Sequence, residues 1–389
     1  MKKKVRLDTN NIVVYENKAW FFSINYPCLC YYDYEKQELV KKKFIYDKKG
    51  YIECLYEKII RIENYIVGIP FWASDVFIYD TKTDKEYYLE ITGDEEINVN
   101  AFYTSTIYEK IIYSFRRFAT KGESGNYVLK IDPFRKKAEY IKLSLDEVNC
   151  NESETVRVFA NENYSGDGFA ILLSEKGNIL KLRLSDFKCD FFDCKISEHP
   201  FYTISRFEES KYFLTDKVGE SFIWDGQHNY RKVKKTQIIE LTNNIISIGK
   251  KYLGAFENSA CYNDMIYLIP SLANVICEYD LKRNVIKKAW FSDEIVFDVA
   301  NEIKTDNYYV GFFSNACLVG KLLFLFCVSS GKLYEIDLEK KIVKSNVMEV
   351  NFTEEELTYI WEYRLKNCGG IIKEDKKIEY ELQTFINMV

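Results

Sequence analysis

The strongest constraint on the fold is a stretch of sequence that the chain contains twice. Residues 64–85, NYIVGIPFWASDVFIYDTKTDK, align without a gap with residues 264–285, DMIYLIPSLANVICEYDLKRNV. In this alignment Asp80 falls on Asp280. A chain of 389 residues is long enough for two or three domains. A pattern that recurs within one chain instead indicates a single structural unit that packs against copies of itself.

The pattern can be followed through seven copies. Each copy has an aromatic or apolar anchor residue at the end of its first strand; the anchors are Tyr15, Ile62, Tyr108, Tyr164, Phe207, Tyr262 and Leu318. Neighbouring anchors lie about 50 residues apart, which is in the range for propeller blades. In six copies an apolar run ends 18 or 19 residues after the anchor, usually at an Asp. The third copy is longer, because residues 116–126 form a polar insert with glycines, which predicts a loop.

Each copy contains four short runs of strand-forming residues. In the sixth copy these runs are residues 254–262, 265–270, 275–281 and 285–291, separated by short polar turns. One four-stranded sheet leaves a face uncovered, whereas seven sheets packed radially around an axis cover one another. The sequence therefore predicts an all-β fold, a seven-bladed β-propeller of four-stranded antiparallel blades over residues 1–350.

The composition agrees with an all-β fold. It also limits the partners and the cellular compartment that we expect for the protein. Aromatic residues make up 16% of the chain, which favours β structure. The net charge of -5 comes from interspersed charges, and no basic stripe is present to attract nucleic acid. No run approaches the roughly 18 apolar residues of a membrane span, and no apolar run follows the basic N-terminus as in a signal peptide. Together with eleven scattered cysteines, these features predict a cytoplasmic protein with no nucleic-acid partner and no membrane insertion.

Most of the recurring side chains have a structural explanation. The Asp that ends the third strand can accept backbone N–H groups in an Asx turn. Cys28 and Cys30 share one face of a strand and are predicted to be small core residues rather than metal ligands. An aromatic residue stands six positions before the anchor in five copies, on the same face as the anchor, and is predicted to be core; these residues are Tyr56, Phe102, Phe201, Phe256 and Phe312.

Residues 351–389 follow a different pattern, which predicts a helix and a strand packed on the propeller. Thr353 and Glu356 form a capping box, and apolar residues then recur at helical spacing until about Gly369. This stripe consists of Leu357, Ile360, Trp361 and Leu365. Residues 377–385, KIEYELQTF, alternate with the period of a strand. Either this strand or the VRL segment near the N-terminus pairs with a blade edge to close the ring, and the sequence leaves both open.

The repeats resemble bacterial seven-bladed β-propeller proteins of the broad kelch and WD40 type. The likeness rests on the recurrence of an apolar run followed by Tyr-Asp, Ile-Asp or Trp-Asp over about residues 8–350. The blades lack the double glycine of kelch repeats, and Trp224-Asp225 stands without the Gly-His of a WD40 blade. The resemblance implies a ring with a binding face at one end of a central channel. It implies no catalytic residue.

Candidate binding residues lie in the loops of one face. In a propeller the loops from the second to the third strand, and those between blades, emerge together around the channel mouth. In this chain the segments between blades are long at 144–157, 237–253 and 292–307. A Trp with neighbouring arginines suits sugar rings, carboxylates or an acidic loop, although each residue could also be an ordinary solvated loop residue. The candidates are Trp72, Arg116, Arg117, Lys121, Glu123, Arg157 and His199.

Two functions are compatible with these residues. The first is a non-enzymatic scaffold that binds a protein partner or a glycan-like small molecule, which the shortage of catalytic residue types favours. The alternative is an enzyme acting on a sugar or related small molecule, with Arg116, Arg117, Glu123 and His199 converging on the channel mouth. The chain has only two histidines and no CxxC pair, so no metal and no cofactor is predicted.

Overall fold

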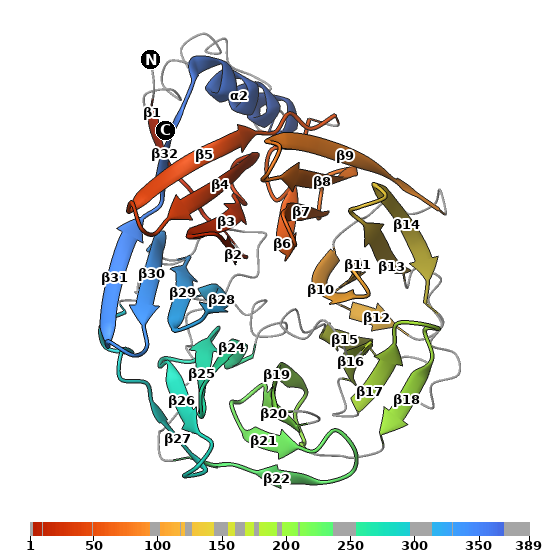
Figure 1. The fold of residues 1–389 in the computed structure, drawn as a ribbon, viewed down its shortest axis with the longest axis vertical. Coiled ribbons are helices and arrows are strands. Elements are labelled where there is room, and N and C mark those ends of the chain that lie inside the picture. The colour runs from red at the N-terminus through yellow and green to blue at the C-terminus, as the bar shows by residue number, and fades with distance from the viewer. Residues whose placement is uncertain are drawn as a thin grey trace.

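The protein is all-β, as the sequence predicts. The computed structural model describes residues 3–9, 11–48, 50–93, 102–116, 118–120, 127–143, 155–159, 168–174, 179–192, 197–208, 211–235, 254–295, 313–328 and 330–368. The sheets are arranged in a ring, with the first strand of each group near the centre and the last at the rim (Figure 1). The described part of the chain contains no helix that is long and apolar enough to cross a bilayer.

Three sheets contain four strands in chain order, each strand antiparallel to the next. The first consists of β2 (Val13–Tyr15), β3 (Lys18–Phe22), β4 (Cys28–Asp33) and β5 (Glu38–Phe44). The second consists of β19 (Phe201–Glu208), β20 (Lys211–Asp216), β21 (Ser221–Trp224) and β22 (Tyr230–Lys232). The third consists of β28 (Phe313–Val319), β29 (Leu322–Cys327), β30 (Lys332–Asp337) and β31 (Ile342–Val347).

An eight-stranded sheet joins two more groups of this kind. One group is β6 (Tyr56–Ile62), β7 (Tyr65–Pro70), β8 (Asp75–Asp80) and β9 (Lys85–Thr92). The other is β10 (Phe102–Tyr108), β11 (Ile111–Arg116), β13 (Tyr127–Asp132) and β14 (Lys137–Lys142). Strands β9 and β14 pair in parallel at the rim, while β6 and β10 pack against each other near the centre. The sheet therefore comes back on itself and is nearly closed.

Two five-stranded sheets each carry one added strand. The first has β15 (Thr155–Phe159), β16 (Phe169–Ser174), β17 (Ile179–Arg183) and β18 (Cys189–Phe192), with β12 (Phe118–Thr120) added on β15. The second has β24 (Phe256–Tyr262), β25 (Met265–Pro270), β26 (Cys277–Asp280) and β27 (Val285–Lys288), with β23 (Lys234–Lys235) added on β27. The interpretation of all these groups as seven blades stays a prediction.

Strand β12 corrects the prediction of a loop over residues 116–126. Arg116 is the last residue of β11, and Phe118–Thr120 pairs antiparallel with β15, which belongs to the next group. Arg157, expected in a loop between blades, is a residue of β15 and lies opposite Phe118. The exposed edge of β15 offers unpaired backbone groups, and pairing satisfies them, which overrides the polar composition of the insert.

The two ends of the ring meet through the N-terminal strand. Strand β1 (Lys3–Arg6) pairs antiparallel with β32 (Glu349–Phe352), and the N–H of Leu7 continues this contact by donating to the carbonyl of Met348 at 2.7 Å. One core cluster then spans both ends of the chain, from Leu7 and Phe21 to Phe324 and Phe352. Strands β1 and β32 form a two-stranded sheet of their own, so the N-terminal segment joins the two ends of the chain but does not pair with an edge strand of a four-stranded group, whereas the sequence predicted pairing with a blade edge. The other candidate, residues 377–385, lies outside the described residues.

Helix α2 (Glu354–Cys368) begins at the predicted capping box. The N–H of Thr353 donates to Glu356 Oε2 at 2.7 Å, and the N–H of Glu356 donates to Thr353 Oγ1 at 3.2 Å. Leu357 and Ile360 are buried in the core cluster of the ring closure. Glu356 also forms a largely buried ion pair with Lys41 of β5. The helix is thus docked against the first sheet by both apolar and charged contacts.

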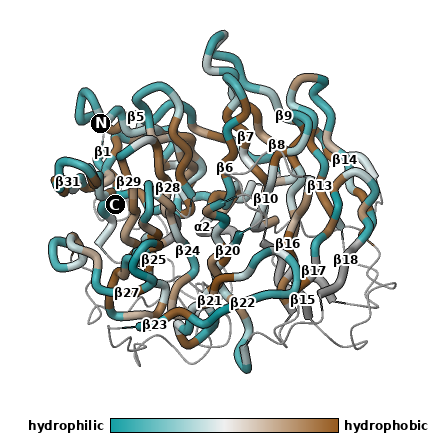
Figure 2. Tube along the Cα trace, turned by 60° about the horizontal axis from the view of Figure 1, so that its bottom comes forward, coloured by the Kyte–Doolittle hydropathy of each residue, from teal (hydrophilic) through white to brown (hydrophobic). Residues whose placement is uncertain are grey.

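The core lies between and within the sheets, and hydrophobic stretches coincide with strands while projecting loops are mostly hydrophilic (Figure 2). The predicted burial of the aromatic residues six positions before the anchors is confirmed for Tyr56, Phe102, Phe201 and Phe256; Phe312 lies outside the described residues. Cys28 and Cys30 are buried with their sulfur atoms 3.6 Å apart, as predicted for core residues.

The Asx-turn prediction is also confirmed. Each recurrent Asp accepts at least one backbone N–H of the following turn through Oδ1, for example from Lys82 to Asp80 at 3.0 Å and from Lys282 to Asp280 at 3.0 Å. The others are Asp33, Asp132, Asp225 and Asp337. The fourth copy has Arg183 at this position, and there Asp186 accepts the N–H of Lys188 instead. These carboxylates are turn-forming groups that end the third strand.

Candidate aromatic binding surface

Trp72 lies in a loop that the preceding segment holds in place. It follows β7, where Pro70 ends the strand. The N–H of Phe71 and that of Ala73 donate to the carbonyl of Leu55 at 2.8 and 3.2 Å, and the N–H of Trp72 donates to the carbonyl of Cys54 at 3.2 Å. Ala73 is buried beneath the loop. The backbone at Trp72 is therefore fixed, so the indole is presented from a rigid support.

The indole of Trp72 stacks with the ring of Tyr51. The two ring centroids are 6.3 Å apart and the planes differ by 27°. Trp72 is 39% exposed and Tyr51 is 36% exposed. Tyr51 is positioned by Asp47, whose carboxylate accepts the N–H of Tyr51 at 3.1 Å and whose carbonyl accepts the N–H of Gly50 at 3.0 Å. Gly50 has a φ of 77°, which a turn of this kind requires of glycine.

Helix α2 extends this aromatic area. The ring of Tyr363 lies 6.3 Å from that of Tyr51, and the ring of Tyr359 meets that of Tyr46 edge-on at 5.1 Å. Tyr46 is 51% exposed, and the hydroxyl of Tyr359 donates to the carbonyl of Asp47 at 3.4 Å. Three segments far apart in the sequence thus form one surface. We call it the aromatic surface, defined by Tyr46, Tyr51, Trp72 and Tyr363.

One charged pair lies close in sequence to the residues of the aromatic surface. Lys48 forms an ion pair with Asp75 at 3.0 Å, and the hydrogen bond from Lys48 to this carboxylate raises the pKa of Lys48. Burial raises the pKa of both Tyr46 and Tyr359, so both phenols are neutral at physiological pH. The surface can therefore offer flat, uncharged rings with polar edges, which suits binding by stacking and burial.

The other sequence-predicted residues lie elsewhere in the ring. Arg116 ends β11, and its charge acts on Tyr140, whose pKa burial raises to about 12. His199 precedes β19, and its backbone N–H donates to Ser197 Oγ at 3.1 Å. Arg157 lies in β15; Arg117, Lys121 and Glu123 fall outside the described residues. The described neighbours of the Trp72 ring are thus aromatic, whereas arginines were expected there.

Sequence reasoning did not find the residues that accompany Trp72. Tyr46 and Tyr51 stand in the short connection between β5 and β6, which carried no expected role. Tyr359 and Tyr363 are four residues apart, and this spacing alone places them on one face of α2. The sequence cannot show that this face meets the connection between β5 and β6, because that contact depends on how the helix docks.

Among the described residues, no group of three His, Cys, Asp or Glu side chains lies close enough together to hold a metal ion. The candidate site is therefore built from aromatic rings, backbone groups and the Lys48–Asp75 ion pair.

Comparisons with known proteins give the fold only. No family model matches the chain, and no curated protein matches its sequence. The chain is similar to the crystal structure of the computationally designed Ika8 protein, with a TM-score of 0.51 and 8% identity over 88% of each chain. It also matches U3-55K (TM-score 0.46, 8% identity, 74% of this chain and 83% of that one). A third match is the extracellular domain of BT4673 from B. thetaiotaomicron (TM-score 0.45, 9% identity, 86% and 46%). At such identity the likeness to Ika8 concerns the fold and carries no function across.

Proposed function

We propose that the protein is a seven-bladed β-propeller that acts as a non-enzymatic binding scaffold and holds a partner protein on its aromatic surface. The blade assignment is supported by the recurrence of four antiparallel strands in chain order and by the Asx turn that precedes the last strand of each group. A propeller is a rigid ring whose loops can differ without cost to the core.

The observation that carries the binding proposal is the pair of exposed, stacked rings of Tyr51 and Trp72. An apolar ring that stays exposed to water does not gain the free energy of burial, which is about 25 cal/mol per Å² of apolar surface. Trp and Tyr are also the residues that contribute most to protein interfaces, where they fill the desolvated centre. Two such rings on a fixed backbone are prepared to bind with little loss of conformational entropy.

A protein partner fits the extent of the surface better than a single sugar. The rings run from Trp72 through Tyr51 and Tyr363 to the contact of Tyr359 with Tyr46. A surface built from three segments suits a broad interface with a central aromatic anchor. A glycan-like ligand would engage one or two rings, and we treat it as an alternative outcome of the test. No described contact favours the enzyme alternative.

The proposal is tested with the variant Tyr51→Ala/Trp72→Ala and the matched control Tyr230→Ala. Tyr230 is 47% exposed and lies in β22, away from the surface. Each protein is used as bait in an affinity capture from the native cytoplasm, and the bound proteins are identified by mass spectrometry. A glycan array is probed with the same proteins in parallel. We expect a protein that the wild type and Tyr230→Ala retain in stoichiometric amount and the double variant loses.

In the purified complex, the partner should also protect the backbone amides of the aromatic surface from hydrogen exchange. Retention of the same partner by the folded double variant would contradict the proposal. Recovery of a glycan alone, dependent on Trp72, would replace the protein partner by a sugar ligand. The double variant should lose about 1–2 kcal/mol of stability, since both rings are only partly buried.

A further inference from the structure

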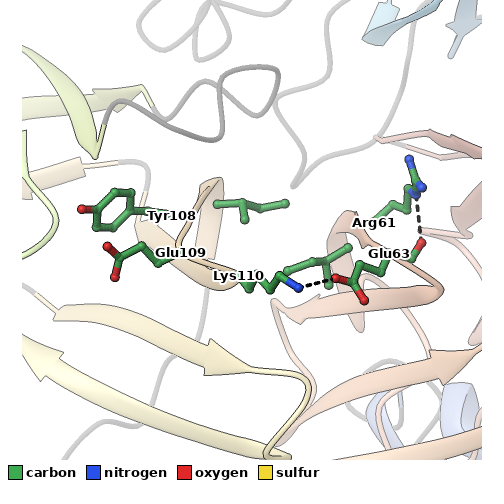
Figure 3. Close-up of a pocket in the computed structure, with 7 residues that line it drawn as sticks. Arg61, Glu63, Tyr108, Glu109 and Lys110 are labelled. Carbon is green, nitrogen blue, oxygen red and sulfur yellow. Dashed lines mark hydrogen bonds and ion pairs between the residues drawn. The ribbon is translucent and has the colours of Figure 1, made fainter.

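The junction between the β6–β7 and β10–β11 turns is closed by contacts within the chain. Lys110 pairs with Glu63 across this junction at 2.8 Å (Figure 3). The Nε of Arg61 donates to the carbonyl of Glu63 at 3.0 Å, and the central carbon of its guanidinium lies 4.7 Å from the centre of the Tyr15 ring. Arg61 and Glu109 point to opposite sides of the depression between the two turns (Figure 3). The depression therefore offers a ligand no convergent pair of charges.

Some strand edges at the rim of the ring, in contrast, have no partner strand among the described residues. Strands β9 and β14 pair with each other, β23 pairs with β27, and β32 packs against β5. Strands β18, β22 and β31 are each the last strand of their sheet, and β31 lies at the outer edge of the ring (Figure 1). An open edge presents N–H and carbonyl groups to any extended chain, so proteins commonly protect it with charged side chains.

The open edge of β31 is apolar where such an edge is usually charged. Ile342 and Val347, at the two ends of the strand, are 46% and 49% exposed. The one charged residue of β31, Lys344, pairs with Glu335 of β30 at 3.4 Å. Strand β22, with the sequence YRK, instead carries two exposed cations. Of these two open edges, that of β31 is therefore the one left without protection against a further strand.

Alternate residues of β31 turn their backbone groups toward the open edge. The N–H of Met348 donates to the carbonyl of Gly331 at 3.2 Å, and the adjacent Val347 lies opposite Lys332 of β30. In an antiparallel ladder every second residue bonds to the neighbouring strand, and the residues between them face away from it. Within the described part of the chain, no strand pairs with the outward groups of β31. The residues that face outward are Val343, Ser345 and Val347.

The sequence of β31 can pair with a second copy of itself. With Ser345 opposite Ser345 of the second copy, Val343 lies opposite Val347, and the outward backbone groups of all three residues are paired. The exposed Val347 then packs on another valine, and Lys344 lies opposite the neutral Asn346. The next register, centred on Lys344, would place two lysines opposite each other, and like charges disfavour it. One register of antiparallel self-pairing is thus preferred.

Charged residues just beyond the strand also complement each other in this arrangement. Lys341 precedes β31, Glu349 begins β32 one residue after β31 ends, and both are exposed. Because the two strands run in opposite directions, Lys341 of each copy approaches Glu349 of the other. Opposite charges are therefore placed at both ends of the paired strands, which favours a second copy of this chain as the occupant of the edge.

We propose that two copies of this chain associate by antiparallel pairing of β31 with β31, which joins two four-stranded groups into one continuous sheet. The paired strands contain no residue of the aromatic surface, so this association does not depend on the binding function proposed above. Two strands of six residues bury less than the roughly 1,600 Å² of a standard interface. We therefore expect a reversible dimer that forms at micromolar or higher concentrations.

Sedimentation velocity of the full chain at increasing concentration tests the association. We expect a reversible equilibrium between monomer and dimer. Val347→Lys should weaken this equilibrium by about tenfold or more, because a charged side chain on an edge strand opposes pairing. Val319→Lys is the matched control, since Val319 is 38% exposed and ends β28, the strand farthest from β31 in the same sheet. The control should dimerise as the wild type does.

Cysteine substitutions test the register. In the preferred register the Cα atoms of the two Ser345 residues are about 5.5 Å apart, which is within the range that a disulfide requires. Diamide should therefore cross-link Ser345→Cys into a covalent dimer well above the level found in the wild type with its own cysteines. Lys344→Cys should stay at the wild-type level, because its two copies are offset along the strands.

Hydrogen exchange identifies what occupies the edge. The amides of Val343, Ser345 and Val347 should exchange rapidly in the dilute monomer and slowly in the concentrated sample. The proposal is overturned if the protein stays monomeric, if Val319→Lys weakens association as much as Val347→Lys, or if Lys344→Cys cross-links in preference to Ser345→Cys. Protection of these amides in the dilute monomer would overturn it as well, because another segment of the same chain would then cover the edge.

Discussion

Residues 64–85 and 264–285 form the same structure with different surfaces. In both, a buried tyrosine donates its hydroxyl across the turn into the fourth strand: Tyr79 to Asp84 at 2.7 Å, and Tyr279 to Asn284 at 2.8 Å. In both, the loop after the second strand is tied to the preceding segment, with Ala73 bonded to the carbonyl of Leu55 and Ala273 to that of Ala255. The residues that repeat are those that the turn geometry needs.

The two segments diverge at the tip of this loop. Trp72 is 39% exposed, whereas Leu272 at the same position is 2% exposed. The N–H groups of the residues on either side have equivalent acceptors in both loops, the carbonyls of Leu55 and Ala255, so the loop can form without an exposed Trp; the N–H of residue 72 itself donates to the carbonyl of Cys54, whereas that of Leu272 donates to the carbonyl of Ala255. The comparison separates residues that build the unit from a residue that the unit displays.

The largest effects are expected at the shared tyrosines. Tyr79→Ala and Tyr279→Ala each remove a buried ring and its hydrogen bond, so each should lower the free energy of unfolding by about 3–5 kcal/mol. Denaturant unfolding of both variants measures this. If the two losses of unfolding free energy differed by more than about 2 kcal/mol, the structural equivalence of the two segments would be contradicted.

Exchange of the divergent residues should separate stability from binding. Leu272→Trp places a larger ring in a buried site and should cost about 1–3 kcal/mol. Trp72→Leu should change stability by less than about 1 kcal/mol and abolish partner capture. Thermal unfolding and the capture assay are run on both proteins. Loss of capture in folded Leu272→Trp, with capture kept in Trp72→Leu, would reverse the assignment.

The Asx turns should contribute a smaller and unequal amount. Asp80 accepts hydrogen bonds from Asn64 Nδ2 at 2.6 Å and Thr83 Oγ1 at 2.8 Å in addition to the N–H of Lys82. Asp280 accepts the N–H groups of Lys282 and Arg283. Asp80→Ala should therefore cost about 1–2 kcal/mol and Asp280→Ala about 1 kcal/mol. Equal losses in urea unfolding would show that the side-chain partners of Asp80 contribute nothing.

The smallest effect is a difference in pH dependence. The hydrogen bond from Tyr79 lowers the pKa of Asp84 below its ordinary value, whereas Asn284 does not titrate. A carboxyl whose folded pKa is depressed stabilises the protein above its unfolded pKa, near 4, and loses that contribution as the pH falls through the folded pKa. Asp84→Asn should thus lose less stability than the wild type between pH 5 and pH 3. Parallel unfolding curves across this range would contradict the assignment.

Much of the fold could be predicted from the sequence because the repeated residues form local structures such as turns and strands. The Asp turns, the buried Tyr56 and Phe102, and the capping box of Thr353 each depend on residues close in the chain or on strand periodicity. Strand β12 could not be predicted, because its pairing with β15 depends on an edge supplied by another group. For the same reason the pairing of β1 with β32 was not predicted, since the sequence indicated that a terminal segment would pair with a blade edge.

The candidate sites were only partly accessible to sequence reasoning. Trp72 could be chosen as a candidate binding residue because it stands in a loop at a position where the copies differ. Its stacking on Tyr51 and the approach of Tyr363 depend on the docking of α2. Only the packing of two neighbouring turns brings Glu63 and Lys110 together.

Hydrogen exchange of the purified complex against the free protein tests the central claim most directly, because it compares both copies in one molecule. The account predicts that the captured partner protects backbone amides in residues 46–55 and 71–73 and in the first turns of α2. Amides of residues 271–273 should exchange equally in both samples. Protection at 271–273, or a complex with no protection around Trp72, would contradict the claim that one copy of the repeated unit displays the binding surface.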